Sequence, residues 1–307
     1  MSVLLQEGIN GLVLGSVYAL IALGYSMVYG IVGLINFAHG DVVMVGALSA
    51  ASCLAALLGL HTPLWLALPL AGLGALVVCM SLGWSIERLA YRPLRRAPRL
   101  APLITAIGVS ILLQNLAILI WGRGFIALPV MFSNQPWVWA GIRMTVVQMV
   151  ILGLCLLLMV ALLLLIHRSS FGRMMRAVAQ NPEAARLMGI DVDRTIAQAF
   201  VLGSALAALA GFMVMADYGQ GDASMGFRLG LKAFSAAVLG GIGNIGGAVL
   251  GGLLLGVIES VGAAYLAPLS GGVLGSQYED VFAFIVLIAV LVWRPSGLLG
   301  QMQADRA

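Results

Sequence analysis

Charged side chains are scarce in this chain of 307 residues: only 9% of them are Asp, Glu, Lys or Arg, and Lys232 is the single lysine. A soluble domain usually carries about 25% charged residues. Hydrophobic residues make up 62% of the chain, and its mean hydropathy is +1.06. Because a water-soluble fold of this length could not hide so much apolar surface, the sequence predicts a protein that lies in the lipid bilayer.

Motifs for catalysis and cofactor binding are also missing. The sequence has no HExxH, no GxSxG and no paired catalytic carboxylate motif, which argues against an intramembrane enzyme. Cys53, Cys79 and Cys155 lie in apolar runs at unrelated spacings, which predicts packing residues rather than metal ligands or disulfides. No G-x-x-x-x-G-K-[ST] phosphate loop occurs, so any ATP that powers the protein binds to another chain. We therefore expect no catalytic residue, no metal and no bound cofactor on this chain.

Long apolar runs dominate what is present. They lie at about 9–30, 40–58, 64–86, 101–121, 145–166, 195–216, 229–266 and 280–293. Because each unpaired backbone group in lipid costs several kcal/mol, such runs are expected to be helices. The sequence predicts an all-α, polytopic membrane bundle of about 8–10 spans, in one transmembrane domain over 1–307.

Arginine supplies almost all of the positive charge, and it is clustered between apolar runs. One cluster holds Arg88, Arg92, Arg95, Arg96 and Arg99, and the other holds Arg168, Arg173, Arg176, Arg186 and Arg194. By the positive-inside rule, both clusters indicate cytoplasmic segments rather than contact with nucleic acid. The segment between them, which carries Trp121, Trp137 and Trp139, is predicted to lie outside, where tryptophan suits the membrane interface.

Two polar, glycine-marked interruptions divide the apolar runs. One reads GLINFAHGD at 33–41, and the other reads LGGIGNIGG at 239–247. Exposed backbone at membrane depth is tolerated only beside protein or a watery cavity, so we expect broken elements, the second near Asn244. Arg294 and Arg306 follow the last apolar run and predict that the C-terminal end lies inside, which requires the run 229–266 to count as two crossings. Paired interrupted segments also predict an internal repeat and a midplane site.

Polar side chains within the apolar runs are candidates for a substrate path, because such groups are costly in a membrane and functional by default. They are Asn36, His39, Asp41, Thr105, Gln114, Asn115, Asn244 and Glu259. Structural roles stay open for several of them. His39 and Asp41 could pair with each other, and Glu259 could cap a helix or meet Lys232. The two adjacent amides of the fourth run could only link helices by hydrogen bonds worth about 1 kcal/mol.

A short polar phrase, NPEAARLMGID, stands between two apolar runs within the second arginine cluster. Asn181 can cap a helix start, and Pro182 suits the first helical position. Glu183 then lies near the positive end of the helix dipole, and Gly189 can take the left-handed conformation that ends the helix. The phrase predicts a helix of about two turns, too short to be stable in water without packing on its own protein or on a partner. A capped surface loop is the alternative.

Within this phrase, the pattern E-A-A-x-x-x-G resembles the EAA loop of ABC importer permeases. In that family the loop forms a coupling helix that inserts into a groove on the ATPase subunit. The usual continuation, I-x-L-P, is absent here, which fits a divergent branch of the family. The resemblance implies a cytoplasmic loop at 168–194 whose ATPase-coupling residues are Asn181, Pro182, Glu183, Ala184, Ala185, Arg186 and Gly189.

Four longer segments are similar to the LivH-type permease of branched-chain amino acid ABC importers, and they occur in order along nearly the whole chain. They are GSVYALIALGYSMVYGIVGLINFAHGD at 15–41, PLITAIGVSILLQN at 102–115, LKAFSAAVLGGIGNIGGAVLGGLLLGVIES at 231–260 and RPSGLLG at 294–300. The resemblance implies a permease subunit in the bacterial inner membrane that passes leucine, isoleucine or valine to the cytoplasm. Related permeases serve urea, short amides or other amino acids.

The same resemblance implies a set of partners. They are a homologous LivM-type permease, two cytosolic ABC ATPases that bind ATP and Mg, a periplasmic or extracellular substrate-binding protein, and the lipid bilayer. A proton-coupled secondary transporter is an alternative that fits the broken helices, with Asp41, His39 and Glu259 as a proton relay. The EAA-like helix does not fit that alternative. A structural membrane subunit without a pathway is a further alternative.

Overall fold

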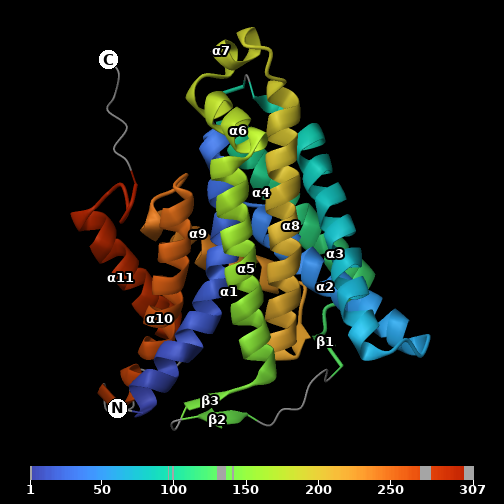
Figure 1. Cartoon of the computed structure of the whole chain (residues 1–307), viewed down its shortest axis with the longest axis vertical. Helices are drawn as coiled ribbons and strands as arrows, with labels where there is room; N and C mark the ends of the chain where they lie inside the picture. The colour runs from blue at the N-terminus through green and yellow to red at the C-terminus, as the bar shows by residue number, and fades with distance from the viewer. Residues whose placement is uncertain are drawn as a thin grey trace.

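The computed structural model describes residues 2–95, 97–98, 100–129, 136–139, 142–269 and 278–300. These residues form a bundle of mostly upright helices (Figure 1), which confirms the predicted all-α, polytopic class. Within the described part, seven helices are long and apolar enough to cross a membrane, and Asp280–Trp293 is a shorter apolar helix. The internal repeat stays a prediction.

The helices differ widely in length. The long ones are α1 (Ser2–Val32), α2 (His39–Gly59), α3 (Leu64–Ile86), α4 (Leu100–Trp121), α5 (Val146–Arg168), α8 (Val192–Tyr218) and α10 (Ile245–Leu269). The short ones are the π-helix η1 (Glu87–Tyr91), the 3-10 helix η2 (Arg92–Leu94), α6 (Ser170–Gln180), α7 (Pro182–Leu187), α9 (Met225–Gly240) and α11 (Glu279–Trp293).

Helix α1 forms the core of the bundle, because 89% of its membrane-crossing window is buried against other helices. Its main neighbours are α10, α8 and α9. A methyl group added at Gly256 of α10 would lie 2.3 Å from the Cα of Gly15 on α1, so the two backbones touch. Lipid provides no hydrophobic driving force for helices to associate, so their association depends on close packing. Small residues at four-residue spacing allow that packing here.

The two ends of the bundle differ in structure and charge. Helices α6 and α7 lie at its upper end in Figure 1, and Arg92 and Arg95 of the first arginine cluster contact Asp193 at the start of α8, just after α7. By the positive-inside rule, that end is predicted to be the cytoplasmic one. Arg96, Arg99 and the side chain of Trp139 lie outside the described residues.

The opposite end carries four short strands that the sequence did not predict. They are β1 (Ile126–Ala127), β2 (Trp137–Trp139), β3 (Ile142–Met144) and β4 (Gln220–Gly221). Strand β1 pairs antiparallel with β4, and β2 with β3. These pairs satisfy backbone groups in the loops at the lower end of Figure 1, where β1, β2 and β3 are labelled.

The first break is shorter than predicted. Helix α1 ends at Val32, Gly33 takes a left-handed φ of 67°, and α2 already begins at His39. The carbonyl of Asn36 accepts a hydrogen bond from the His39 backbone nitrogen at 3.0 Å, which starts the new helix. His39 and Asp41 therefore lie in the first turn of α2 rather than in an unwound segment, and the interruption covers only 33–38.

The second break lies near Asn244, as predicted. Helix α9 ends at Gly240, and α10 begins at Ile245. Asn244 Oδ1 accepts a hydrogen bond from the Gly247 backbone nitrogen at 3.0 Å, and its Nδ2 donates to the Leu299 carbonyl at 2.7 Å. One asparagine thus caps α10 and fixes the segment that follows α11. A further interruption lies at 219–224, between α8 and α9, within the gap that the sequence shows between the apolar runs 195–216 and 229–266.

Helices α2 and α9 begin beside each other in the middle of the fold. A methyl group added at Gly40 would lie 2.3 Å from the Gly226 carbonyl oxygen and 2.6 Å from the Gly230 Cα. Only glycine can occupy such a backbone contact. The interruptions at 33–38 and 219–224 thus bring the starts of two helices together, next to the polar residues described below.

Candidate functional site

The predicted cytoplasmic loop contains the helix that the sequence predicts. Asn181 Oδ1 accepts hydrogen bonds from the backbone nitrogens of Glu183 and Ala184, both at 3.0 Å. Gly189 ends the turn with a left-handed φ of 82° and donates its backbone nitrogen to the Arg186 carbonyl at 3.0 Å. The predicted cap and stop are therefore present on α7, and the observed helix ends at Leu187.

Helix α7 is anchored on one side and open on the other. Ala185 is only 4% exposed, whereas Leu187 is 90% and Met188 is 82% exposed. The helix projects from the predicted cytoplasmic end of the bundle, at the top of Figure 1. Two large apolar side chains at such a tip form a small surface suited to a partner's groove.

Adjacent helices hold this loop in place. Arg176 of α6 donates a hydrogen bond from Nη1 to the Ile166 carbonyl at 2.6 Å, near the end of α5. Ser169 caps α6 by accepting a hydrogen bond from the Gly172 backbone nitrogen at 3.1 Å. Because α6 is tied to the end of α5, the base of α7 is fixed to the membrane-spanning body.

Asp41 and Gln114 form a polar contact inside the apolar bundle. Gln114 Nε2 donates to Asp41 Oδ1 at 3.1 Å and to Ser110 Oγ at 3.2 Å. Asp41 is only 1% exposed. Two of the predicted path residues, from α2 and α4, are thus brought together, and Ser110 joins them.

A small cavity of about 70 Å³ adjoins this polar contact. Ser110 lines it on α4, and most of the other side chains are aromatic or aliphatic. The rings of Phe37 and Tyr25 lie 5.9 Å and 6.2 Å from the ring of Phe234, all three being lining residues. An apolar pocket next to a buried carboxylate can accept an aliphatic group on one side and a cation on the other.

His39 packs against an aromatic ring of α1 rather than pairing with Asp41. Its ring packs edge-on against Tyr25, with ring centroids 4.7 Å apart, and it is 1% exposed. Gly24 of α1 leaves room for that ring, since a methyl group there would lie 2.4 Å from His39 Nε2. No ion pair joins His39 to Asp41 among the described side chains.

Glu259 belongs to a separate ionic cluster. The Lys232 ammonium contacts the Glu259 carboxylate and lies 2.7 Å from Asp280 Oδ1. Tyr18 donates a hydrogen bond to Glu259 Oε1 at 3.2 Å. The contact between Lys232 and Glu259, left open by the sequence, is therefore present, and it joins α1, α9, α10 and α11.

Among the described side chains, the remaining candidates make no hydrogen bond to Asp41. Asn115 Nδ2 donates to the Ile111 carbonyl at 2.8 Å within its own helix, so its amide does not link helices. Thr105 is half-buried on α4. Asn36 is 4% exposed, and its Oδ1 accepts a hydrogen bond from Tyr91 at 3.2 Å.

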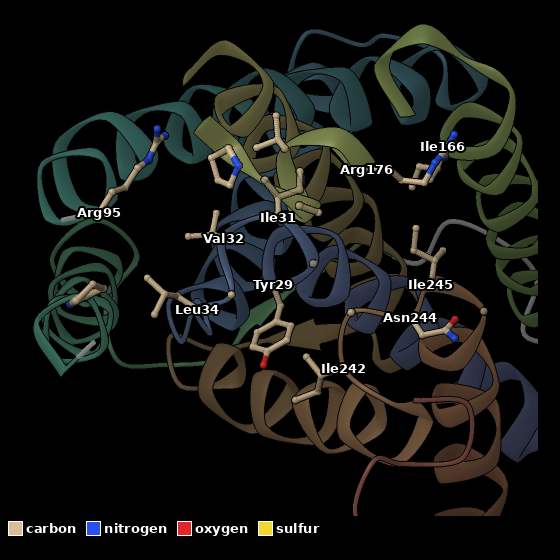
Figure 2. Close-up of a pocket in the computed structure, with 18 of the residues that line it drawn as sticks. Tyr29, Ile31, Val32, Leu34, Arg95, Ile166, Arg176, Ile242, Asn244 and Ile245 are labelled. Atoms are coloured by element: carbon tan, nitrogen blue, oxygen red, sulfur yellow. The ribbon is translucent and has the colours of Figure 1, made fainter. Parts of the chain in front are cut away.

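Asn244 lines a larger cavity at the predicted cytoplasmic end, with a volume of about 1110 Å³. Figure 2 shows Asn244 and Ile245 facing this space from the second break, with Arg95 and Arg176 at its edge. Tyr29 and Val32 contribute from the end of α1. The eight predicted path residues therefore fall into separate groups rather than one site.

Membrane-length helices interrupted at glycines, with a buried polar contact between α2 and α4, are typical of a membrane transport protein. Over residues 8–291 the chain matches the family model for the permease component of branched-chain amino acid transport systems, and it belongs to that family. It is thus a multi-pass inner-membrane transport component rather than an enzyme.

Curated relatives agree with this family. The chain is 46% identical to the high-affinity branched-chain amino acid transport system permease protein LivH of Salmonella typhimurium, over 98% of this chain and 97% of the relative. It shows the same identity and coverage with BraD of Pseudomonas aeruginosa, which carries the same description. The autoinducer 2 import system permease LsrC of Yersinia enterocolitica is 31% identical, over 64% of this chain and 53% of the relative.

Proposed function

We propose that this chain is the membrane-spanning subunit of an ATP-driven importer that passes leucine, isoleucine and valine from an external binding protein to the cytoplasm. The observation that carries the proposal is α7, with its buried Ala185 and its exposed Leu187 and Met188 on the arginine-rich side. Because the sequence has no phosphate loop, ATP and Mg bind to two separate cytosolic ATPases, and α7 is the element that docks on them.

A second permease subunit of the LivM type completes the membrane part in this proposal. Helices α4 and α5 support it, because only 22% and 28% of their membrane-crossing windows are buried within this chain. Their exposed side chains are apolar, with Leu112 of α4 and Leu157 of α5 as examples. Such faces fit either lipid or a homologous helical subunit.

The substrate path includes Asp41, Gln114 and Ser110. A branched-chain amino acid carries an ammonium group and an aliphatic side chain. The Asp41 carboxylate suits the first, and the neighbouring cavity beside Phe37 and Phe234 suits the second. An external binding protein that has already selected the substrate leaves this path needing only weak binding.

The other candidates take supporting places in this proposal. Asn244 lies on the wall of the cytoplasmic cavity, where it faces the substrate on release. Asn36 stabilises the first break through its hydrogen bond with Tyr91. His39 packs on Tyr25 and Glu259 pairs with Lys232, and these contacts hold together the helices that surround the path. Thr105 and Asn115 lie on α4, whose exposed face adjoins lipid or the second permease subunit.

Reconstitution tests the transport function. The permease pair, the ATPases and the binding protein are placed in proteoliposomes, and uptake of radiolabelled leucine is followed with and without ATP inside. We expect ATP-dependent uptake that isoleucine and valine inhibit and that urea and acetamide do not. Uptake of urea or an amide alone would refute the substrate, and leucine uptake that needs a proton gradient but no ATP would refute the mechanism.

Variants of α7 test its docking role. Gly189→Trp and Glu183→Lys are expected to uncouple uptake from ATP hydrolysis while the chain still inserts in the membrane. Gly122→Trp is the matched control, because Gly122 also has a left-handed φ, of 86°, and like Gly189 has no atom within 4 Å of an added methyl group. Normal uptake in both α7 variants would rule out this role.

A further inference from the structure

Asp193 is the meeting point of three arginines at the cytoplasmic end. Its Oδ2 accepts a hydrogen bond from Arg92 Nη2 at 2.6 Å, and its Oδ1 accepts one from Arg95 Nη1 at 2.5 Å. Arg186 Nη2, on α7, lies 3.8 Å from the same Oδ1. Asp193 stands in the first turn of α8, so one carboxylate connects α7, α8 and the segment that follows α3.

The segment after α3 is an unusual helix that continues this connection inward. Arg95 also contacts the carboxylate of Glu87, whose side chain is only 2% exposed. Glu87 is the first residue of the π-helix Glu87–Tyr91. A π-helical turn in a membrane helix is rare and often marks a functional position, because it rotates the residues that follow it.

The far end of this π-helix reaches the first membrane break. Tyr91 is 2% exposed, and its hydroxyl donates to Asn36 Oδ1 at 3.2 Å and lies 3.3 Å from the Ile35 carbonyl. Its ring also packs against Phe200 of α8, with ring centroids 5.1 Å apart. Asn36 in turn accepts the backbone hydrogen bond that starts α2 at His39.

We propose that Asp193 and Tyr91 are positioning residues that transmit the movement of α7 to the start of α2, where the substrate path begins. The connection runs from Arg186 through Asp193 and Arg95 to the π-helix, and through Tyr91 to Asn36. It rests on the proposed docking of ATPases on α7. It adds residues that lie outside both the EAA-like motif and the candidate path.

The contact of α7 with Asp193 is weaker than the contacts that Arg95 makes, so α7 can move relative to the ends of α3 and α8. Arg186 is 53% exposed and lies at 3.8 Å from Asp193, beyond hydrogen-bond distance, so α7 can make or lose this contact at little cost. Arg95 is 17% exposed and binds two carboxylates at once, so the cytoplasmic ends of α3 and α8 stay together. Because α7 ends at Leu187 and α8 already begins at Val192, a displacement of α7 also reaches Asp193 through the chain, and Arg95 then moves both ends as one unit. Tyr91 carries that movement to the break.

Substitution of Asp193 tests the proposal in the assembled importer. Asp193→Asn keeps the size of the side chain and removes its charge. In proteoliposomes we expect leucine uptake to fall by about tenfold while ATP hydrolysis and co-purification of the ATPases change by less than about twofold. Asp193→Glu restores the charge and should recover most of the uptake. Equal loss of uptake and hydrolysis, or unchanged uptake, would overturn the proposal.

Tyr91→Phe tests the connection at the end near the first break. It is an independent test of the proposal if the Asp193 variant fails to fold. It keeps the ring that packs on Phe200 and removes only the hydroxyl contacts to the break. We expect the same uncoupling, with a monodisperse, normally assembled complex. If uptake stays fully coupled to ATP hydrolysis in this variant, the proposed connection through Tyr91 is wrong.

Asp222→Asn is the matched control. Asp222 lies between α8 and α9 and accepts a hydrogen bond from Arg228 at 3.0 Å, away from the Asp193 contacts. Loss of the Asp222 charge should leave coupling unchanged. The α7 variants separate the two proposals. If Gly189→Trp uncouples the importer but Asp193→Asn and Tyr91→Phe do not, the docking role stands and the transmission route fails. If none of them uncouples it, the docking role fails as well.

Discussion

Gln114 on α4 donates a hydrogen bond to Asp41 on α2, with 3.1 Å between its Nε2 and the carboxylate oxygen Oδ1. Only 22% of the membrane-crossing window of α4 is buried, so this helix has little apolar packing with the rest of the chain. A polar contact between two membrane helices therefore holds α4 against the core at the level of the candidate path.

Removing either partner of this contact should weaken transport. Asp41→Asn removes the negative charge proposed to face the substrate's ammonium group, and we expect leucine uptake to fall by about tenfold or more, since a hydrogen bond to a charged group contributes about 1.5–3 kcal/mol. Gln114→Leu should have a smaller effect of the same sign. Initial uptake rates in proteoliposomes measure both.

Asn115→Leu is the matched comparison for Gln114→Leu. Its amide is bonded only within α4, so uptake should change by less than about twofold. Equal losses at 114 and 115 would place the path elsewhere on α4.

Lys232 should contribute strongly to stability. Lys232→Met removes the cation that the carboxylates of Glu259 and Asp280 share, and breaking such a buried contact typically destabilises a protein by about 3–5 kcal/mol. Thermal unfolding of the purified chain in detergent measures the change. Arg228→Met, which breaks an ion pair whose arginine is 64% exposed, should change stability by about 1 kcal/mol or less. Similar effects in the two variants would contradict the role of burial.

Gly40 should tolerate no side chain. The methyl group of Gly40→Ala would lie 2.3 Å from the Gly226 carbonyl oxygen, which forces α2 and α9 apart and destabilises the fold by about 1–3 kcal/mol. Gly108→Ala is the control, because nothing lies within 4 Å of its added methyl group, and alanine in a helix is favoured over glycine. Melting temperatures of the two variants should move in opposite directions, and a neutral Gly40→Ala would disprove the close contact.

The cap of α7 should control how well that helix is formed. Asn181→Ala removes the side-chain acceptor for two backbone nitrogens and should destabilise α7 by about 1 kcal/mol. Hydrogen–deuterium exchange over 182–187 should then become faster, whereas Asn181→Asp should retain the slow exchange. Unchanged exchange in Asn181→Ala would mean that packing of Ala185 alone forms the helix.

Much of this architecture could be predicted from local sequence signals. The apolar runs became membrane-length helices because backbone groups in lipid must be satisfied within the helix. The phrase from Asn181 to Gly189 became a capped helix because cap, proline and glycine act within a few residues of one another. For the same reason the break near Asn244 could be recognised from a run of glycines.

Contacts between distant segments could not be predicted in this way. Asp193 lies 98 residues from its partner Arg95, and Tyr91 lies 55 residues from Asn36. The pairing of His39 with Asp41, which the sequence left open, is not found among the described side chains. In α2, residues two positions apart point in different directions, so each side chain contacts a partner on another helix.

Accessibility of α7 tests the central claim that the ATPases are separate chains and that they dock on this permease at its cytoplasmic end. Met188→Cys, at an 82% exposed position, is made in a chain with Cys53→Ala, since Cys79 and Cys155 are buried. Val138→Cys, 65% exposed on β2, reports the opposite face. With a membrane-impermeant maleimide, the thiol introduced by Met188→Cys should react only in inverted vesicles and be protected by the bound ATPases. Reaction from the outside in intact cells, or no protection by the ATPases, would contradict the account.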